Sequence, residues 1–241
     1  MILRKIYNRY FSSNRLFANK MRLLLGFTPV NLRLYQTAFR HKSVAQVLHH
    51  GHKNSNERLE FLGDAVLSIV VAEVLFRKYP FKEEGFLTDM RSKVVNRVHL
   101  NQLALKLGFE HFLNYDSKTV SFTTKQSALL GDAFEALVGA IYLDVGYGCA
   151  KKFLVERILS HHVDLVKLEQ TENHKSKLLE WCQRNAKDLK FVLVDNSEND
   201  DYKLFIVQVV IDGDIFGLGK DYNKKNAEKV AAEKTCEMLA I

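Results

Sequence analysis

Residues 56–64 read Asn-Glu-Arg-Leu-Glu-Phe-Leu-Gly-Asp, and the chain then stays almost entirely apolar for several turns. This pattern predicts a helix that is enclosed on most of its sides. At about 100° per residue, Glu57, Glu60 and Asp64 lie on one face of that helix. Ionised carboxylates are rarely buried without partners, because removing a charge from water costs several kcal/mol. Either a basic side chain such as Arg58 neutralises this acidic stripe, or a cation binds to it.

A second acidic stripe lies within residues 127–143, which read Ser-Ala-Leu-Leu-Gly-Asp-Ala-Phe-Glu-Ala-Leu-Val-Gly-Ala-Ile-Tyr-Leu. Asp132 and Glu135 share one face of this mostly apolar helix. Two such helices can pack with their acidic stripes converging, and a cluster of carboxylate oxygens suits Mg²⁺ or Mn²⁺. Pairs of such ions about 3.5–4 Å apart recur in enzymes that cut phosphodiesters. The spacing alone does not favour metal binding over the alternative, in which a basic side chain neutralises the acidic stripe.

Both stretches carry a resemblance to a known family. The sequence at 56–64 resembles the signature of the ribonuclease III family of double-stranded-RNA endonucleases. The segment Gly-Asp-Ala-Phe-Glu-Ala-Leu-Val-Gly at 131–139 resembles the second acidic motif of that family, at the expected distance. The likeness extends from about Leu34 to the C-terminus, so it covers most of the chain.

The resemblance implies roles for individual acidic side chains. The implied metal ligands are Glu60, Asp132 and Glu135. The implied catalytic carboxylates are Asp64 and Glu135, and supporting acidic roles fall to Glu57 and Glu84. We therefore expect these side chains to gather around one metal centre.

The resemblance also implies an activity and partners. It implies a divalent-metal-dependent endoribonuclease that cleaves double-stranded RNA to 5′-phosphate and 3′-hydroxyl ends, in the processing of ribosomal and other structured RNA precursors. Mg²⁺ is the implied cofactor, and Mn²⁺ is expected to substitute for it. A homodimer is implied, with Phe61 near its interface, although from the sequence alone Phe61 is interpreted simply as a core aromatic residue.

Two alternatives remain open. A non-catalytic RNA-binding or ribosome-associated protein on the same fold is one, although such members usually lose carboxylates that this chain keeps. Phosphohydrolysis of small nucleotides at an all-helical acidic site is the other, and it leaves the C-terminal part of the chain unexplained.

The composition is typical of a globular protein, with 241 residues of which 47% are hydrophobic and 26% are charged. No apolar run reaches the ~18 residues that a membrane helix needs, so we expect no membrane association. The three cysteines are far apart in the chain, and they are Cys149, Cys182 and Cys236. This spacing argues against disulfides or a zinc site and favours the cytoplasm, with the cysteines as small core residues.

The formal charge of +7 is spread unevenly along the chain. Residues 1–56 hold ten basic side chains and no acidic one, which predicts an anionic partner such as RNA. We divide the chain into a basic N-terminal arm (1–27), an all-helical nuclease domain (28–165), a linker (166–173) and a duplex-RNA-binding domain (174–241). The arm also has the composition of a mitochondrial transit peptide, but it continues into the domain without a loop-like break.

Residues 174–241 change from helical to alternating periodicity and back. A helix from Lys175 is followed by three strands, of which the last two are joined by the turn Asp212-Gly213. Asn223 is placed to cap a final helix over residues 224–239. This α-β-β-β-α order resembles the double-stranded-RNA-binding domain.

In that family the first and last helices contact RNA, largely by reading the A-form shape over about 16 bp. The implied RNA-binding residues are Lys224, Lys225 and Lys229 on the last helix, and Ser176, Glu180 and Gln183 on the first. Two departures predict weak binding by this domain: an acidic loop at residues 197–202, and Leu179 where the family usually has glutamine. The nuclease domain and the basic arm are expected to contribute the remaining affinity.

Overall fold

The computed structural model describes residues 2–10, 12–47, 51, 53–118, 125–170, 174–199 and 202–241. The chain divides into two compact units, residues 1–168 and 169–241. Each unit has its own hydrophobic core, built from apolar residues of that unit alone.

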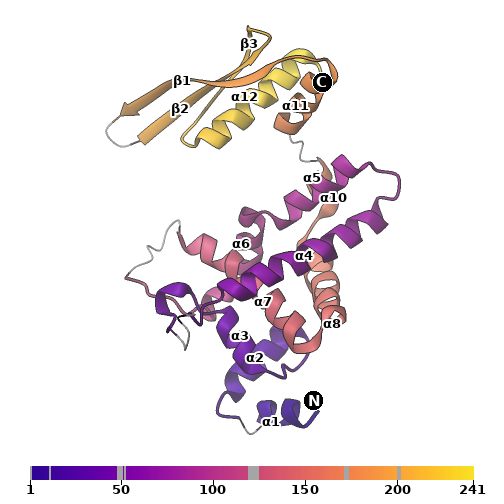
Figure 1. The fold of residues 1–241 in the computed structure, drawn as a ribbon, viewed down its shortest axis with the longest axis vertical. Coiled ribbons are helices and arrows are strands. Elements are labelled where there is room, and N and C mark those ends of the chain that lie inside the picture. Colours follow the sequence, from indigo (N-terminus) through magenta and orange to yellow (C-terminus); the bar gives the residue numbers. More distant parts are fainter. Residues whose placement is uncertain are drawn as a thin grey trace. The chain divides into compact units, whose positions relative to one another are not determined.

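Every regular element in the described part of the first unit is helical, which confirms the predicted all-α class (Figure 1). The α-helices are α1 (Ile2–Tyr10), α2 (Arg15–Leu25), α3 (Leu32–Ala38), α4 (Glu57–Lys78), α5 (Glu84–Val95), α6 (Arg97–Lys106), α7 (Lys125–Val145), α8 (Tyr147–Lys152), α9 (Ser160–His162) and α10 (Leu165–Gln170). Short 3-10 turns, η1 (Lys42–Val44) and η3 (Phe109–His111), and a π-helical stretch, η4 (Phe153–Leu159), connect them.

Helices α4 and α7 cross at the centre of this unit and form its most extensive helix–helix interface. Two glycines permit the close crossing. A Cβ atom at Gly63 would overlap the carbonyl oxygen of Glu135, and one at Gly139 would overlap the carbonyl oxygen of Leu59. The backbones therefore touch where each helix lacks a side chain, and this close approach sets the separation of the two acidic stripes.

One face of α4 is exposed along its length, contrary to the expectation that the helix is enclosed on most sides. The exposed fractions of Phe61, Ile69 and Phe76 are 83%, 57% and 71%. The interpretation of Phe61 as a core aromatic residue is therefore wrong for the single chain. The three residues are spaced eight and seven apart, so they form a single stripe. A stripe of large apolar side chains left in water by a single chain is typical of an interaction surface.

The N-terminal segment does not lie wholly outside the core. Ala18, Met21 and Leu25 of α2 are buried in the first unit, although the charge pattern places residues 1–27 in an arm. Helix α1 is held by Asn8, whose Nδ2 donates to the carbonyl oxygen of Val30 at 2.9 Å. Apolar residues at helical spacing fix α2 to the core despite its positive charge.

The second unit has the predicted α-β-β-β-α order, which confirms the fold class. Its elements are α11 (His174–Arg184), β1 (Leu189–Asn199), β2 (Tyr202–Ile211), β3 (Asp214–Asp221) and α12 (Lys224–Leu239). The strands form an antiparallel sheet in the order β1-β2-β3, and both helices lie on one face of it (Figure 1). The predicted turn is confirmed, because Ile211 pairs with Asp214 and both turn residues have positive φ angles, 53° at Asp212 and 93° at Gly213.

The β1–β2 hairpin is longer than predicted. Residues 197–199, which we expected to begin an acidic loop, continue β1 and pair with residues 202–204 of β2. Residues 200–201 of that predicted loop lie outside the described residues. Backbone pairing continues through this polar segment because each added pair completes hydrogen bonds that strand ends otherwise leave to water.

The cysteines differ in their surroundings. Cys182 and Cys236 are buried in the second unit, as expected of small core residues, whereas Cys149 is exposed and the prediction for it is wrong. None of the three cysteines forms a disulfide. Among the described residues, no helix combines the length and the hydrophobicity that crossing a bilayer requires.

Candidate functional site

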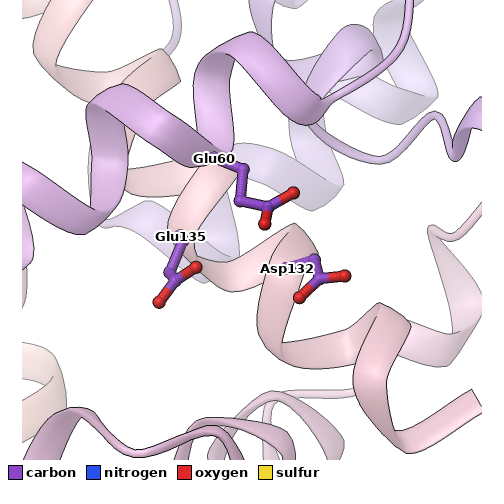
Figure 2. A group of neighbouring side chains, drawn as sticks. All are labelled: Glu60, Asp132 and Glu135. Carbon is purple, nitrogen blue, oxygen red and sulfur yellow. The ribbon is translucent and has the colours of Figure 1, made fainter.

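Three carboxylates meet where α4 crosses α7. Glu60 comes from α4, and Asp132 and Glu135 come from α7 (Figure 2). One oxygen from each side chain lies within 4.8 Å of the others, and all three side chains are half-buried. We call these three residues the carboxylate cluster.

The geometry of the cluster follows from the helix crossing. Gly63 lies one turn beyond Glu60 and touches the backbone of Glu135, so the two acidic side chains start from adjacent points. Nearby, Asn101 of α6 accepts a hydrogen bond at its Oδ1 from the backbone N–H of Gly131, at 2.8 Å. This bond fixes the segment of α7 that carries Asp132.

The pKa values of all three carboxylates are raised, and burial is the largest cause in each case. Burial, and then the charges of Asp64, Glu60 and Asp132, raise the pKa of Glu135 from its ordinary value of 4.5 to about 7. Burial and the charge of Asp132 raise the pKa of Glu60. Burial also raises the pKa of Asp132, whereas the positive charge of Arg97 acts to lower it.

Burial, and for Glu60 and Glu135 the neighbouring negative charges, disfavour the ionised cluster, and the positive charge nearby does not offset this. Its donors are all carboxylate oxygens, which are the ligands that hard divalent cations such as Mg²⁺ prefer. A divalent cation would supply the missing charge, so the residues present fit a metal centre. The same raised pKa values predict that protons compete with the metal as the pH falls below about 7.

Three other predicted site residues lie outside the cluster. Asp64 is exposed on α4 and near enough for its charge to raise the pKa of Glu135. Glu57 is exposed and forms an ion pair with Lys42, with 3.3 Å between Glu57 Oε1 and Lys42 Nζ. Glu84 begins α5 and accepts a 2.7 Å hydrogen bond from the hydroxyl of Thr88. The roles expected of these residues remain predictions.

Two residues near the cluster were not predicted from the sequence. Arg97 forms an ion pair with Asp132, and Asn101 anchors Gly131. They are four apart on α6 and therefore share one face. The available signal was an arginine at a helix N-terminus, where a positive charge is disfavoured by the helix dipole.

The predicted RNA-binding lysines lie together at the start of α12. Lys224, Lys225 and Lys229 are exposed, and none of them forms an ion pair with the described side chains. Asn223 caps this helix, as predicted, by accepting a hydrogen bond from the N–H of Lys225 at 2.9 Å. Exposed ammonium groups beside free backbone N–H groups at a helix N-terminus attract phosphate.

The predicted RNA-binding residues on α11 also share one face. Ser176 is half-buried, and Glu180 and Gln183 are exposed at positions four and seven residues further on. The Nζ of Lys175 lies 2.6 Å from Glu228 Oε2, which ties α11 to α12. The structure thus presents both groups of predicted RNA-binding residues from one packed pair of helices.

Comparisons with known proteins agree with this description. The family profile described as "Ribonuclease-III-like" matches residues 31–162, and that described as "Double-stranded RNA binding motif" matches residues 174–239. Ribonuclease 3 of Bacteroides fragilis is 42% identical over 218 residues, covering 90% of this chain and 74% of that protein. Ribonuclease 3 of Zunongwangia profunda is 38% identical over 234 residues, covering 97% and 95%.

A solved structure matches the first unit. The nuclease domain of ribonuclease III from Campylobacter jejuni is 33% identical, with a TM-score of 0.53 over 59% of this chain and 96% of that one. Its description names a region involved in dimer formation.

The fold and the site define a helical nuclease, centred on a carboxylate cluster and joined to a double-stranded-RNA-binding domain. The chain belongs to the ribonuclease III family, and it is an endoribonuclease of that family.

Proposed function

We propose that this enzyme hydrolyses double-stranded RNA with Mg²⁺, for which Mn²⁺ can substitute, and leaves 5′-phosphate and 3′-hydroxyl ends. The observation that carries the proposal is the convergence of Glu60, Asp132 and Glu135 at the α4–α7 crossing. Nuclease activity is assigned to residues 28–165 and duplex binding to residues 174–241. Ribosomal and other structured RNA precursors are the proposed substrates. The cytoplasm is the proposed location, which agrees with cysteines that form no disulfides.

Each group of acidic residues has its own part in the proposed reaction. Glu60, Asp132 and Glu135 hold divalent cations through their carboxylate oxygens. When bound, such ions stabilise the charge that develops on the phosphate and on the leaving oxygen. Asp64, exposed beside Glu135, orients the attacking water. The oxygen of that water bonds to phosphorus and the water loses a proton, while the bond from phosphorus to the 3′ oxygen breaks and that oxygen takes up a proton from solvent. One product therefore ends in a 3′-hydroxyl, and the other keeps the phosphate at its 5′ end.

Glu57 and Glu84 are proposed to support the centre from outside the cluster. A homodimer is proposed as the active form, with Phe61 at its interface. The exposed apolar stripe of Phe61, Ile69 and Phe76 supports this, because a single chain leaves it in water. A second copy that covered the stripe would bury its side chains on both subunits.

Removal of divalent metal is expected to abolish cleavage while leaving the duplex bound. The experiment incubates a labelled long RNA duplex with the protein in Mg²⁺, in Mn²⁺, in EDTA, and in Ca²⁺. Short duplex products with 5′-phosphate ends are expected in Mg²⁺ and in Mn²⁺ only, because Ca²⁺ supports binding but is too large and flexible in its coordination for the same chemistry. Binding without cleavage in Mg²⁺ and Mn²⁺ alike would instead place this chain among non-catalytic RNA-binding proteins.

Replacing Lys224 and Lys225 together with alanine is expected to weaken binding of every duplex about equally. An ion pair with phosphate carries no sequence information, and removing one such pair lowers the slope of log affinity against log salt by roughly one. The measurement is a salt titration of duplex affinity in Ca²⁺. Lys234→Ala on the same helix is a control, because its Nζ already donates to the carbonyl oxygen of Leu218 at 3.0 Å. An unchanged salt slope would remove Lys224 and Lys225 from the interface.

A further inference from the structure

Arg97 is the positive side chain that meets the carboxylate cluster directly. Its Nη2 lies 3.4 Å from Asp132 Oδ1, and the side chain of Arg97 is 67% exposed while that of Asp132 is 23% exposed. Within the described residues, no other lysine or arginine forms an ion pair with a member of the cluster. The guanidinium therefore reaches the cluster from its solvent side.

The position of Arg97 is not explained by its own helix. It is the first residue of α6, whose first turn contains no acidic residue. The partial positive charge at a helix N-terminus disfavours a cation there. Attraction by the cluster offsets this, since the charge of Arg97 acts on Glu60, Asp132 and Glu135 alike.

The direction of Arg97 is set by its neighbours on α6. Asn96 caps the helix by accepting a hydrogen bond from the N–H of His99 at 2.9 Å. One turn beyond Arg97, Asn101 is bonded to the backbone of Gly131 in α7. The face of α6 that carries Arg97 is thus held against the part of α7 that carries Asp132.

The ion pair itself is loose. A guanidinium has five N–H donors, and the described residues give Arg97 a single long hydrogen bond, to Asp132. The attraction also depends on the charge of the cluster, which its ionised carboxylates make negative. Divalent cations would cancel that charge, so the attraction for Arg97 would weaken or reverse. A released guanidinium matches the oxygens of a phosphodiester in both charge and geometry.

We propose that Arg97 is an exchangeable counter-charge, which pairs with Asp132 in the metal-free enzyme and turns to a phosphate of the bound RNA once divalent cations occupy the cluster. This inference rests on the proposed metal-dependent function and adds a substrate-binding residue to it. Arg97 thereby couples metal binding to RNA binding at the site of cleavage.

The test measures Mn²⁺ binding without RNA, by calorimetry and by the electron paramagnetic resonance of free Mn²⁺. Arg97→Ala is expected to bind Mn²⁺ about tenfold more tightly, because removing one positive charge near a dication is worth roughly that factor at the high effective dielectric of an exposed site. Arg97→Lys keeps the charge and is expected to bind Mn²⁺ as the wild type does. Lys106→Ala removes a charge from the exposed far end of α6 and is the matched control.

Cleavage is then measured at saturating metal. Arg97→Ala is expected to lower kcat/KM about tenfold or more. Arg97→Lys is expected to lower kcat/KM by a smaller factor, because lysine keeps the charge but lacks the planar guanidinium that binds phosphate. Tighter metal binding combined with slower cleavage is a result that a merely structural role would not produce. Arg97→Gln serves as a second neutral variant if thermal melting shows that Arg97→Ala is unstable.

Unchanged or weaker Mn²⁺ binding by the neutral variants would overturn the counter-charge, and wild-type kcat/KM at saturating metal would overturn the interaction with RNA. A folded wild-type protein that bound no Mn²⁺ would instead refute the proposed metal centre. Failure of this inference is thereby distinguished from failure of the proposed function.

Discussion

Replacing Glu135 with glutamine is expected to abolish RNA cleavage, with a loss on the order of a thousandfold or more. Loss of a group that only orients a metal ligand typically costs about 10–100-fold, and Glu135 is itself a proposed ligand. Glutamine keeps the size of the side chain but offers a neutral oxygen to the metal. Duplex binding in Ca²⁺ is expected to persist, because the predicted RNA-binding lysines lie on α12.

The same variant is expected to stabilise the metal-free protein at and above neutral pH. In the folded protein the pKa of Glu135 is raised from 4.5 to about 7. The stability that this raised pKa contributes is therefore fully present below pH 4.5 and is lost as the pH rises through 7. Glutamine cannot ionise, so the variant avoids this loss of folding stability. The loss is about 1 kcal/mol after allowance for the partial exposure of Glu135 to solvent. Thermal melting in EDTA between pH 5 and pH 8 measures this difference.

Glu156→Gln is the matched control, because the Glu156 side chain is 62% exposed and pairs only loosely with Lys152, at 3.9 Å. It is expected to cut and melt like the wild type. Cleavage retained by Glu135→Gln would remove Glu135 from the metal centre. Loss of duplex binding in Ca²⁺ would show that Glu135 has a structural role.

Replacing Gly63 with alanine is expected to destabilise the first unit by about 3 kcal/mol, the upper end of the usual cost of overpacking. The added Cβ would overlap the carbonyl oxygen of Glu135, and backbone cannot move aside as a flexible side chain can. The two helices must separate, which draws Glu60 away from Glu135. The melting temperature should fall by roughly 10 °C, and Mn²⁺ affinity should fall with it.

Gly148→Ala provides the control for Gly63→Ala. Gly148 lies in α8, and no heavy atom lies within 4 Å of a Cβ added there. Alanine has the higher helix propensity, so this variant should be stabilised by about 0.5–1 kcal/mol. Equal melting of Gly63→Ala and the wild type would mean that the backbones of α4 and α7 do not touch at Gly63.

Local sequence patterns predict most of the elements because the forces behind them act over a few residues. The apolar pattern that continues to Phe76 predicts α4, and the turn Asp212-Gly213 with the cap Asn223 predicts the end of β2 and the start of α12. The family motifs name Glu60, Asp132 and Glu135 as a group. The β1–β2 hairpin is predicted too short, because the polar sequence of residues 197–199 shows no strand pattern although the backbone of these residues pairs with β2.

The sequence by itself determined the two-part organisation, the helical and mixed fold classes, and the identity of the acidic helices. The tertiary structure alone decided how closely these carboxylates converge, because Gly63 and Gly139 let two helices from distant parts of the chain touch through their backbones. The tertiary structure also placed Arg97 beside Asp132 and paired Glu57 with Lys42. Helical periodicity gives the face on which a side chain lies, whereas its neighbours depend on how separate helices pack, which no local pattern contains.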